Sequence, residues 1–154
     1  MINKSFTRTV VRPMEIDDLK KVLEIEEQSF PIPWTFNIFC YELILNRYAK
    51  YFVLEKDRKI IGYFGFWHKR DRYHITNIAI TEKLRKKGYG ENLLRYIEKI
   101  AVTYKVKKIS LEVRRSNYIA RNMYRKYRYK VIRFVRNYYQ EEKEDAVVME
   151  KKLN

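Results

Sequence analysis

A chain of 154 residues is long enough to bury one hydrophobic core, and 46% hydrophobic residues with 16% aromatics exclude a disordered segment. The single cysteine excludes a disulfide framework within the chain, and two histidines without partners at metal-ligand spacing indicate no zinc site. A formal net charge of +15 favours polyanionic partners, such as a phosphorylated cofactor, RNA, the ribosome or acidic peptides, without selecting one.

The sequence predicts neither a membrane span nor a signal peptide. Its longest run without a charged residue, 28–41, contains two prolines and is too short to cross a bilayer. The first eight residues lack the apolar core of a signal peptide. Together with the cysteine usage, these features predict a soluble, cytoplasmic protein in a reducing compartment.

The first eighty residues predict four strands and two helices. The strands alternate or are rich in β-branched and aromatic residues, and they lie at residues 6–12, 50–55, 60–68 and 73–80. Short turns join the last three, which predicts an antiparallel meander. The helices carry apolar residues at helical spacing, and they lie at residues 15–28 and 35–45, with Thr35 as the candidate N-cap of the second.

An apolar loop separates these two helices. Pro31 and Pro33 stand at alternate positions between Phe30 and Trp34, where they force extended backbone and prevent a helix. Such a rigid loop can line a groove for a partner, or it can pack on the core as a connector, and the sequence leaves both open. Cys40, in the next helix, is expected to pack in the core.

A basic loop follows the strand at 73–80 and precedes a helix expected at 92–101. Gly88 and Gly90, two of the four glycines of the chain, lie in it, and glycine lets a ligand approach the backbone closely. A loop that opens a helix points unpaired N–H groups at one spot, where the helix dipole favours an anion. The cations Arg85, Lys86 and Lys87 add to that field. The residues indicate capture of a phosphorylated cofactor, although they also fit a plain surface turn.

The last third of the chain predicts a strand, a helix and a final hairpin, at residues 106–113, 117–127, 131–139 and 145–152. No internal repeat, linker or low-complexity tract divides the sequence. We therefore expect a single domain over residues 1–154, of α/β (α+β) class, with a mixed, mostly antiparallel sheet and helices on both faces.

Two motifs resemble those of the GCN5-related N-acetyltransferases (GNAT). Arg-x-x-Gly-x-Gly at 85–90 is similar to the coenzyme A pyrophosphate loop of that family, and it lacks the third glycine of the dinucleotide fingerprint. Leu-Glu-Val-Arg-Arg-Ser-Asn at 111–117 is similar to a segment of the protein N-terminal acetyltransferases, in the RimI and archaeal Ard1 branch. The resemblance covers 60–149 well and the first fifty residues loosely.

This resemblance implies transfer of the acetyl group of acetyl-CoA to the N-terminal α-amine of proteins or peptides, with coenzyme A as product. It implies Glu112 as proton acceptor and Tyr124 as donor to the leaving thiolate. A tyrosine pKa of about 10 exceeds that of a thiol, about 8.5, so Tyr124 is expected to act mainly as a hydrogen-bond donor. Taken without the resemblance, the two residues read as a solvated strand carboxylate and a core tyrosine.

The resemblance also implies two binding regions. Cofactor-binding residues would be Ile78, Ala79, Ile80, Arg85, Lys86, Lys87, Gly88, Tyr89, Gly90, Glu91, Asn117 and Tyr124. Substrate-binding residues would be Phe30, Pro31, Trp34, Tyr138 and Tyr139. The family commonly has Gly-Phe after its last helix, whereas this chain has Arg128-Tyr129, which puts that turn in question.

Two other functions stay open. The same chemistry could act on lysine ε-amines, polyamines or other small amines. A protein of another class, a basic nucleic-acid-binding domain, would use the interleaved tyrosines and arginines of 124–139 for stacking and pairing, although this stretch holds no recognised motif. The basic surface would also allow the enzyme to associate with the ribosome. No metal ion and no membrane partner are expected.

Overall fold

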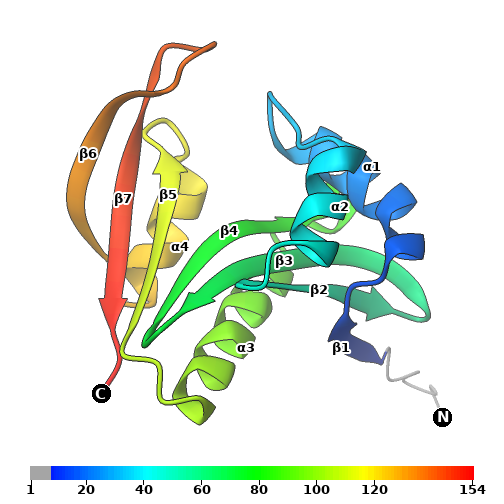
Figure 1. Cartoon of the computed structure of the whole chain (residues 1–154). Coiled ribbons are helices and arrows are strands. Elements are labelled where there is room, and N and C mark those ends of the chain that lie inside the picture. The colour runs from blue at the N-terminus through cyan, green and yellow to red at the C-terminus, as the bar shows by residue number, and fades with distance from the viewer. Residues whose placement is uncertain (1–7) are drawn as a thin grey trace, which may run out of the picture. The chain divides into compact units, whose positions relative to one another are not determined.

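The computed structural model describes residues 8–154, so the start of the strand expected at 6–12 lies outside the described residues. The described chain forms seven strands, four α-helices and two short 3-10 helices (Figure 1). The strands are β1 (Thr9–Pro13), β2 (Ala49–Lys56), β3 (Lys59–Lys69), β4 (Arg72–Ile80), β5 (Lys108–Arg114), β6 (Lys130–Tyr139) and β7 (Glu144–Lys152). The helices are η1 (Ile16–Asp18), α1 (Leu19–Ser29), α2 (Phe36–Ile44), η2 (Glu82–Leu84), α3 (Tyr89–Thr103) and α4 (Tyr118–Lys126).

Each expected strand and helix is present, and two helix starts differ from the expectation. The helix expected from residue 15 begins as the 3-10 helix η1 at Ile16 and continues as α1 from Leu19. For α3 the sequence indicated a start at 92, whereas the helix begins at Tyr89. Gly90 therefore lies in the first helical turn and not in the loop before it. Glu91 occupies the same turn, where an acidic side chain interacts favourably with the helix dipole.

The strands form one mixed sheet in the order β1-β2-β3-β4-β5-β7-β6. The β1–β2, β5–β7 and β6–β7 pairs are antiparallel, whereas β4 and β5 are parallel. Parallel neighbours need a crossover connection, which α3 provides. The expected class, a mixed and mostly antiparallel α/β sheet, is confirmed.

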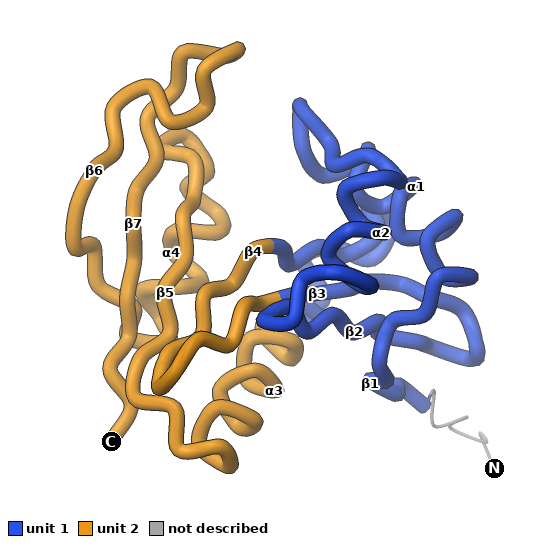
Figure 2. The backbone as a smooth tube through the Cα atoms, viewed as in Figure 1, with its two compact units in different colours: residues 1–65, 77–90 blue, residues 66–76, 91–154 orange. Residues whose placement is uncertain are grey.

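The chain divides into two compact units, residues 1–65 with 77–90 and residues 66–76 with 91–154 (Figure 2). The first unit contains α1, α2 and the loop at residues 85–88 before α3, which is called the glycine-containing loop. The second contains α3, α4 and the strands β5 to β7. The expectation of one domain over 1–154 stays a prediction. None of the helices between residues 8 and 154 is long and apolar enough to cross a membrane.

An aromatic-rich core fills the first unit. Its buried members are Met14, Leu19, Val22, Ile25, Phe39, Tyr51, Val53, Tyr63 and Ala79. Cys40 packs against this core, as expected. The ring of Tyr51 lies where a side chain at position 65 would project, and a Cβ at Gly65 would overlap that ring. Gly65 thus permits a close approach of ring to sheet.

The second unit is built on the alternation of β5. Ile109, Leu111 and Val113 are buried there, and Leu111 and Val113 are aligned with Met149 and Val147 of β7. These two belong to an apolar run of β7, 146–149, in which all four residues are buried. The turn after α4 forms although it lacks glycine, because Arg128 adopts a left-handed backbone with φ 70°. The Tyr129 N–H then donates to the Tyr124 carbonyl at 3.0 Å, which places the Tyr129 ring in the interior.

Candidate active site

The glycine-containing loop is held in place by Arg85. Its Nε donates to the Ile80 carbonyl at 3.0 Å. Its Nη2 donates to the Gln28 carbonyl at 3.1 Å and to Ser29 Oγ at 3.0 Å. The guanidinium, expected to hold a cofactor, thus makes protein contacts that tie the loop to the ends of β4 and α1.

Past Arg85 the loop is open to a ligand. Gly88 has φ 89°, a conformation that favours glycine, and a Cβ there would meet nothing within 4 Å. The exposed side chains of Lys86 and Lys87 form no hydrogen bond or ion pair with residues 8–154. The helix that begins at Tyr89 contributes N–H groups that lack intrahelical partners. Open space, cations and free N–H groups fit a phosphate-bearing cofactor.

The expected cofactor residues at the borders of the loop already have protein partners. In the first unit, Ala79 belongs to the core and the Ile80 carbonyl accepts a hydrogen bond from Arg85. In the second, Glu91 accepts from Tyr127 Oη at 2.8 Å and from Lys126 Nζ at 3.0 Å. Asn117 caps α4, since its Oδ1 accepts from the Ala120 N–H at 3.2 Å. These side chains position the segments that carry them.

In the second unit, Glu112 pairs with a histidine that the sequence interpretation left without a role. His74 Nε2 lies 2.7 Å from Glu112 Oε2, and His74 Nδ1 lies 2.9 Å from Ser110 Oγ. With a proton on Nε2, the imidazole donates to the carboxylate. Both side chains are only partly accessible, 29% for His74 and 20% for Glu112. The arrangement holds the carboxylate in one orientation.

The register of two parallel strands explains this pair. His74 of β4 is aligned with Ser110 of β5, and the next residue on the same face of β5 is Glu112. The β4–β5 ladder ends at Ile75 and Leu111, one residue before Glu112. The sequence did contain a signal for this pair, since two strands joined by one helix each carry a polar, ionisable residue at an alternate position. This signal identifies His74 and Glu112 as neighbours only when the register of the two strands is known.

Three tyrosines accompany Glu112 in the second unit. Tyr124 is 4% exposed, and burial raises its pKa, with a further rise from Tyr139. Burial raises the pKa of Tyr139 to about 12 against the opposing effect of Arg114, whose guanidinium carbon lies 3.9 Å from the ring centroid. Burial and then the charge of Glu112 raise the pKa of Tyr138. All three phenols therefore stay protonated at neutral pH and can donate hydrogen bonds.

In the first unit, the apolar loop packs on the core, which is one of the two roles that the sequence left open, and the partner-binding role stays a prediction. Phe30 and Trp34 pack against the core, whereas Pro31 and Ile32 are exposed. The loop is anchored by Glu26 of α1, whose Oε1 accepts the Trp34 N–H at 3.0 Å. Its rigid base and exposed tip suit contact with a partner.

Glu26 is an acidic residue in an apolar interior. It is 1% exposed, and its Oε2 has no hydrogen-bond partner among residues 8–154. Burial raises its pKa to about 7, against the opposing hydrogen bonds from the Trp34 N–H and the Asn77 side chain. Sequence reasoning missed it, although Glu26 follows Leu19 and Val22 at helical spacing on the buried face of α1.

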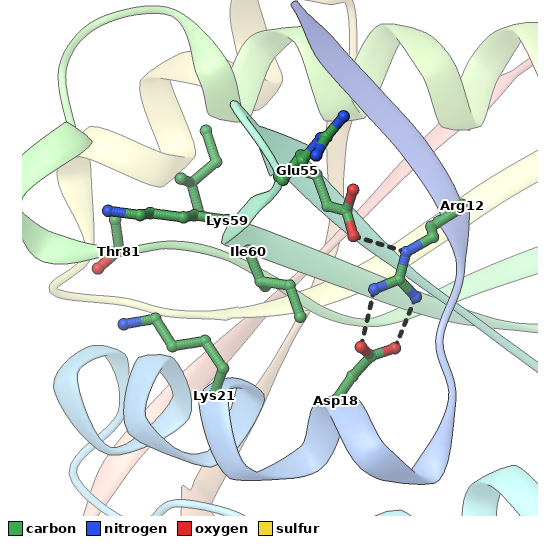
Figure 3. A pocket seen from close by; sticks show the side chains of 9 residues that line it. Arg12, Asp18, Lys21, Glu55, Lys59, Ile60 and Thr81 are labelled. Carbon is green, nitrogen blue, oxygen red and sulfur yellow. Dashed lines mark hydrogen bonds and ion pairs between the residues drawn. The ribbon is translucent and has the colours of Figure 1, made fainter.

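A separate pocket of about 500 Å³ lies in the first unit (Figure 3). There the Arg12 guanidinium donates to both oxygens of Asp18 at 2.8 Å and to Glu55 Oε1 at 2.7 Å. These bonds hold the pKa of Asp18 below its usual range. The pocket includes none of the expected site residues, and we assign Arg12 to stability. No cluster of His, Cys, Asp or Glu among residues 8–154 could hold a metal ion.

The fold is that of an N-acetyltransferase. A crystal structure of the ribosomal-protein-S18-alanine N-acetyltransferase from Escherichia coli superimposes with a TM-score of 0.88 at 24% identity, over 96% of this chain and 95% of that chain. The model of the acetyltransferase (GNAT) family matches residues 19–128. The chain belongs to this family, and the predicted fold and acetyltransferase activity are confirmed.

Two sequence relatives refine the comparison. A Bacillus subtilis protein described as a candidate [ribosomal protein bS18]-alanine N-acetyltransferase is 41% identical over 143 residues, which cover 93% of this chain and 95% of that protein. An N-alpha-acetyltransferase of Sulfurisphaera tokodaii is 29% identical over 152 residues, 90% of each chain. Both names fall within the branch that the motifs at 111–117 resemble.

The buried carboxyl of Glu26 should make stability fall as the pH rises. Its pKa is raised in the folded state, so between the ordinary value of 4.5 and about 7 the folded protein binds more protons than the unfolded chain. The free energy of unfolding therefore decreases through that window. Glu26→Gln removes this dependence, and relative to wild type it should gain up to roughly 3 kcal/mol between pH 4.5 and 7.5.

Urea denaturation at a series of pH values measures this difference. Glu27→Gln, a change at the exposed neighbouring position, is the matched control and should track the wild type. Parallel stability curves for wild type and Glu26→Gln from pH 4 to 8 would contradict the assignment of a buried, proton-binding carboxyl.

Proposed function

We propose that this protein transfers the acetyl group of acetyl-CoA to the N-terminal α-amine of a protein substrate. The observation that carries the proposal is the oriented carboxylate of Glu112, paired with His74 and accompanied by Tyr138 and Tyr139. The names of the relatives support an α-amine substrate, and that of the Bacillus relative suggests a ribosomal protein with an N-terminal alanine. An association with the ribosome is part of this proposal.

The glycine-containing loop would hold the cofactor. Backbone N–H groups from Gly88 to Glu91 would bind the diphosphate, with Lys86 and Lys87 adding positive charge. Backbone groups of Ile78 to Ile80 would bind the pantetheine arm, and the early end of the β4–β5 ladder supports this assignment. Acetyl-CoA, when bound, supplies the thioester carbonyl that the amine attacks.

Glu112 would accept the proton that the substrate amine must lose before it attacks. His74 acts as a positioning residue, because its hydrogen bond restricts the carboxylate to one orientation. Tyr124 would donate a hydrogen bond to the departing sulfur. Its raised pKa makes full proton transfer to a thiolate unfavourable, so hydrogen bonding is the role that the phenol can perform.

The peptide would be held by the exposed tip of the apolar loop and by the paired tyrosines at the end of β6. The rings of Tyr138 and Tyr139 meet edge to face, with centroids 5.0 Å apart. Tyrosine hydroxyls can hydrogen-bond to peptide backbone while the rings exclude water, which gives a grip that tolerates sequence variation.

Gly88→Val should weaken acetyl-CoA binding at least about tenfold, because a β-branched residue cannot readily adopt φ 89° and the N–H groups would no longer converge. Isothermal titration calorimetry measures this. Asp57→Val places the same residue at another left-handed position, φ 51°, in the β2–β3 turn, and should bind acetyl-CoA like wild type. Equal affinity in all three proteins would overturn the loop assignment.

Glu112→Gln should lower kcat by roughly 10² to 10⁴ with little change in peptide KM, because a general base acts in the chemical step. His74→Leu should lower kcat about tenfold and leave the peptide KM nearly unchanged, since the carboxylate loses the hydrogen bond that orients it. His74→Gln keeps a donor and should recover part of the loss. Full activity of Glu112→Gln at neutral pH would indicate another base.

A peptide with a free N-terminus and an internal lysine distinguishes the proposed substrate from the main alternative. An α-amine has a pKa of about 7.7 to 8, against about 10.4 for lysine, so at pH 7 roughly a tenth of α-amines but under a thousandth of lysines are neutral. We expect the acetyl group mainly on the α-amine by mass spectrometry. Acetylation mainly on the lysine would favour the ε-amine reaction instead.

A further inference from the structure

Strand β6 presents apolar side chains that the core does not use. It is the last strand of the sheet order and pairs with β7 (Figure 1). Phe134 is 56% exposed and Ile132 is 51% exposed, whereas Val147 and Val148 on the aligned part of β7 are buried. The Arg115 guanidinium carbon lies 5.8 Å from the centroid of the Phe134 ring, and the exposed part of that ring is available to a partner.

The same part of the chain is purely basic. Residues 114–140 contain no aspartate or glutamate, nine lysines or arginines and seven aromatic residues. Four of the nine cations are engaged, since Arg114 and Arg115 form ion pairs, Lys126 contacts Glu91 and Arg121 donates to a carbonyl. The side chains of the other five are exposed and make no hydrogen bond, ion pair or ring contact with residues 8–154: Arg125, Arg128, Lys130, Arg133 and Arg136. These five, with Ile132 and Phe134, are called the β6 surface. It includes both faces of the sheet at this edge, since Arg133 and Phe134 are consecutive in the ladder.

The β6 surface carries the two elements of single-stranded nucleic-acid binding. Cations without acidic partners attract a phosphate backbone, and an exposed aromatic ring offers a platform on which a base can stack. A second copy of this chain is a poor occupant, because pairing two such edges would bring ten cations together without a balancing acid. A partner that binds only through negative charge would make no use of Ile132 and Phe134, whereas the faces of nucleic-acid bases can pack against them.

We propose that the β6 surface binds single-stranded RNA. The choice of RNA over DNA rests on the proposed function, because a substrate from the ribosome is found beside RNA. The surface excludes the residues assigned to acetyl transfer, so it would hold the enzyme near its substrate without taking part in the reaction.

Fluorescence anisotropy with a labelled twelve-nucleotide oligouridine and the full chain tests this proposal. The double variant Arg133→Gln with Arg136→Gln should weaken binding. It should also reduce the magnitude of the slope of log K against log salt concentration by about 1.4, since each contact with a single-strand phosphate contributes about 0.7. Arg58→Gln with Lys59→Gln, at the β2–β3 turn and the first residue of β3, removes the same charge and should have little effect. Phe134→Ala should weaken binding by roughly fivefold to 150-fold. Phe36→Ala removes a ring that is 49% exposed on α2 and should leave binding unchanged.

Three results would overturn the proposal: equal losses in the two charge-matched double variants, tighter binding of the corresponding DNA oligonucleotide, or stronger competition by polyglutamate than by unlabelled RNA. Acetyl transfer to a short free peptide should be unchanged in Arg133→Gln with Arg136→Gln. A wild-type protein that binds RNA at β6 but acetylates no α-amine would refute the proposed enzymatic function and support the RNA site, so the two failures are distinguishable.

Discussion

The guanidinium of Arg85 is the contact on which the arrangement of the first unit depends. It joins the end of β4 to the last turn of α1, and Phe30, the first residue of the apolar loop, follows that turn directly. One side chain thus fixes the starts of both the proposed cofactor loop and the proposed peptide loop. Arginine can do this because its planar fork carries five donors. In the proposed function, anion binding is therefore assigned to Lys86, Lys87 and the backbone.

A second contact fixes the other end of the apolar loop. Glu26 holds the Trp34 N–H, and the Trp34 ring packs edge to face on Phe39 with centroids 5.4 Å apart. Burying this carboxyl is costly, as its raised pKa shows. An acid is nevertheless useful at this position, because a loop that contains two prolines has few N–H groups with which to anchor itself.

The sequence was sufficient for the order of the elements and for the residues that cap them. Thr35 accepts a hydrogen bond at the start of α2, as its position before an apolar pattern indicates. Asn117, which the resemblance assigned to the cofactor, caps α4 in the same way. The sequence was insufficient for contacts set by tertiary structure. The His74–Glu112 pair depends on the β4–β5 register, and the partners of Arg85 depend on the packing of α1 beside β4. Local patterns give neither, so the resemblance pointed to Glu112 as the proposed base but not to the histidine beside it.

The pairing of Glu112 with His74 matters for position and not for base strength. A free carboxylate has a reference pKa of about 4.3 and an α-ammonium group about 7.8, so transfer between them in water is uphill by roughly 5 kcal/mol. A base that is weaker than the amine is effective only if it is held in place as the proton leaves. His74 can hold it, because its Nε2 lies 2.7 Å from Glu112 Oε2 and its Nδ1 lies 2.9 Å from Ser110 Oγ, so that β5 fixes the ring and the ring fixes the carboxylate.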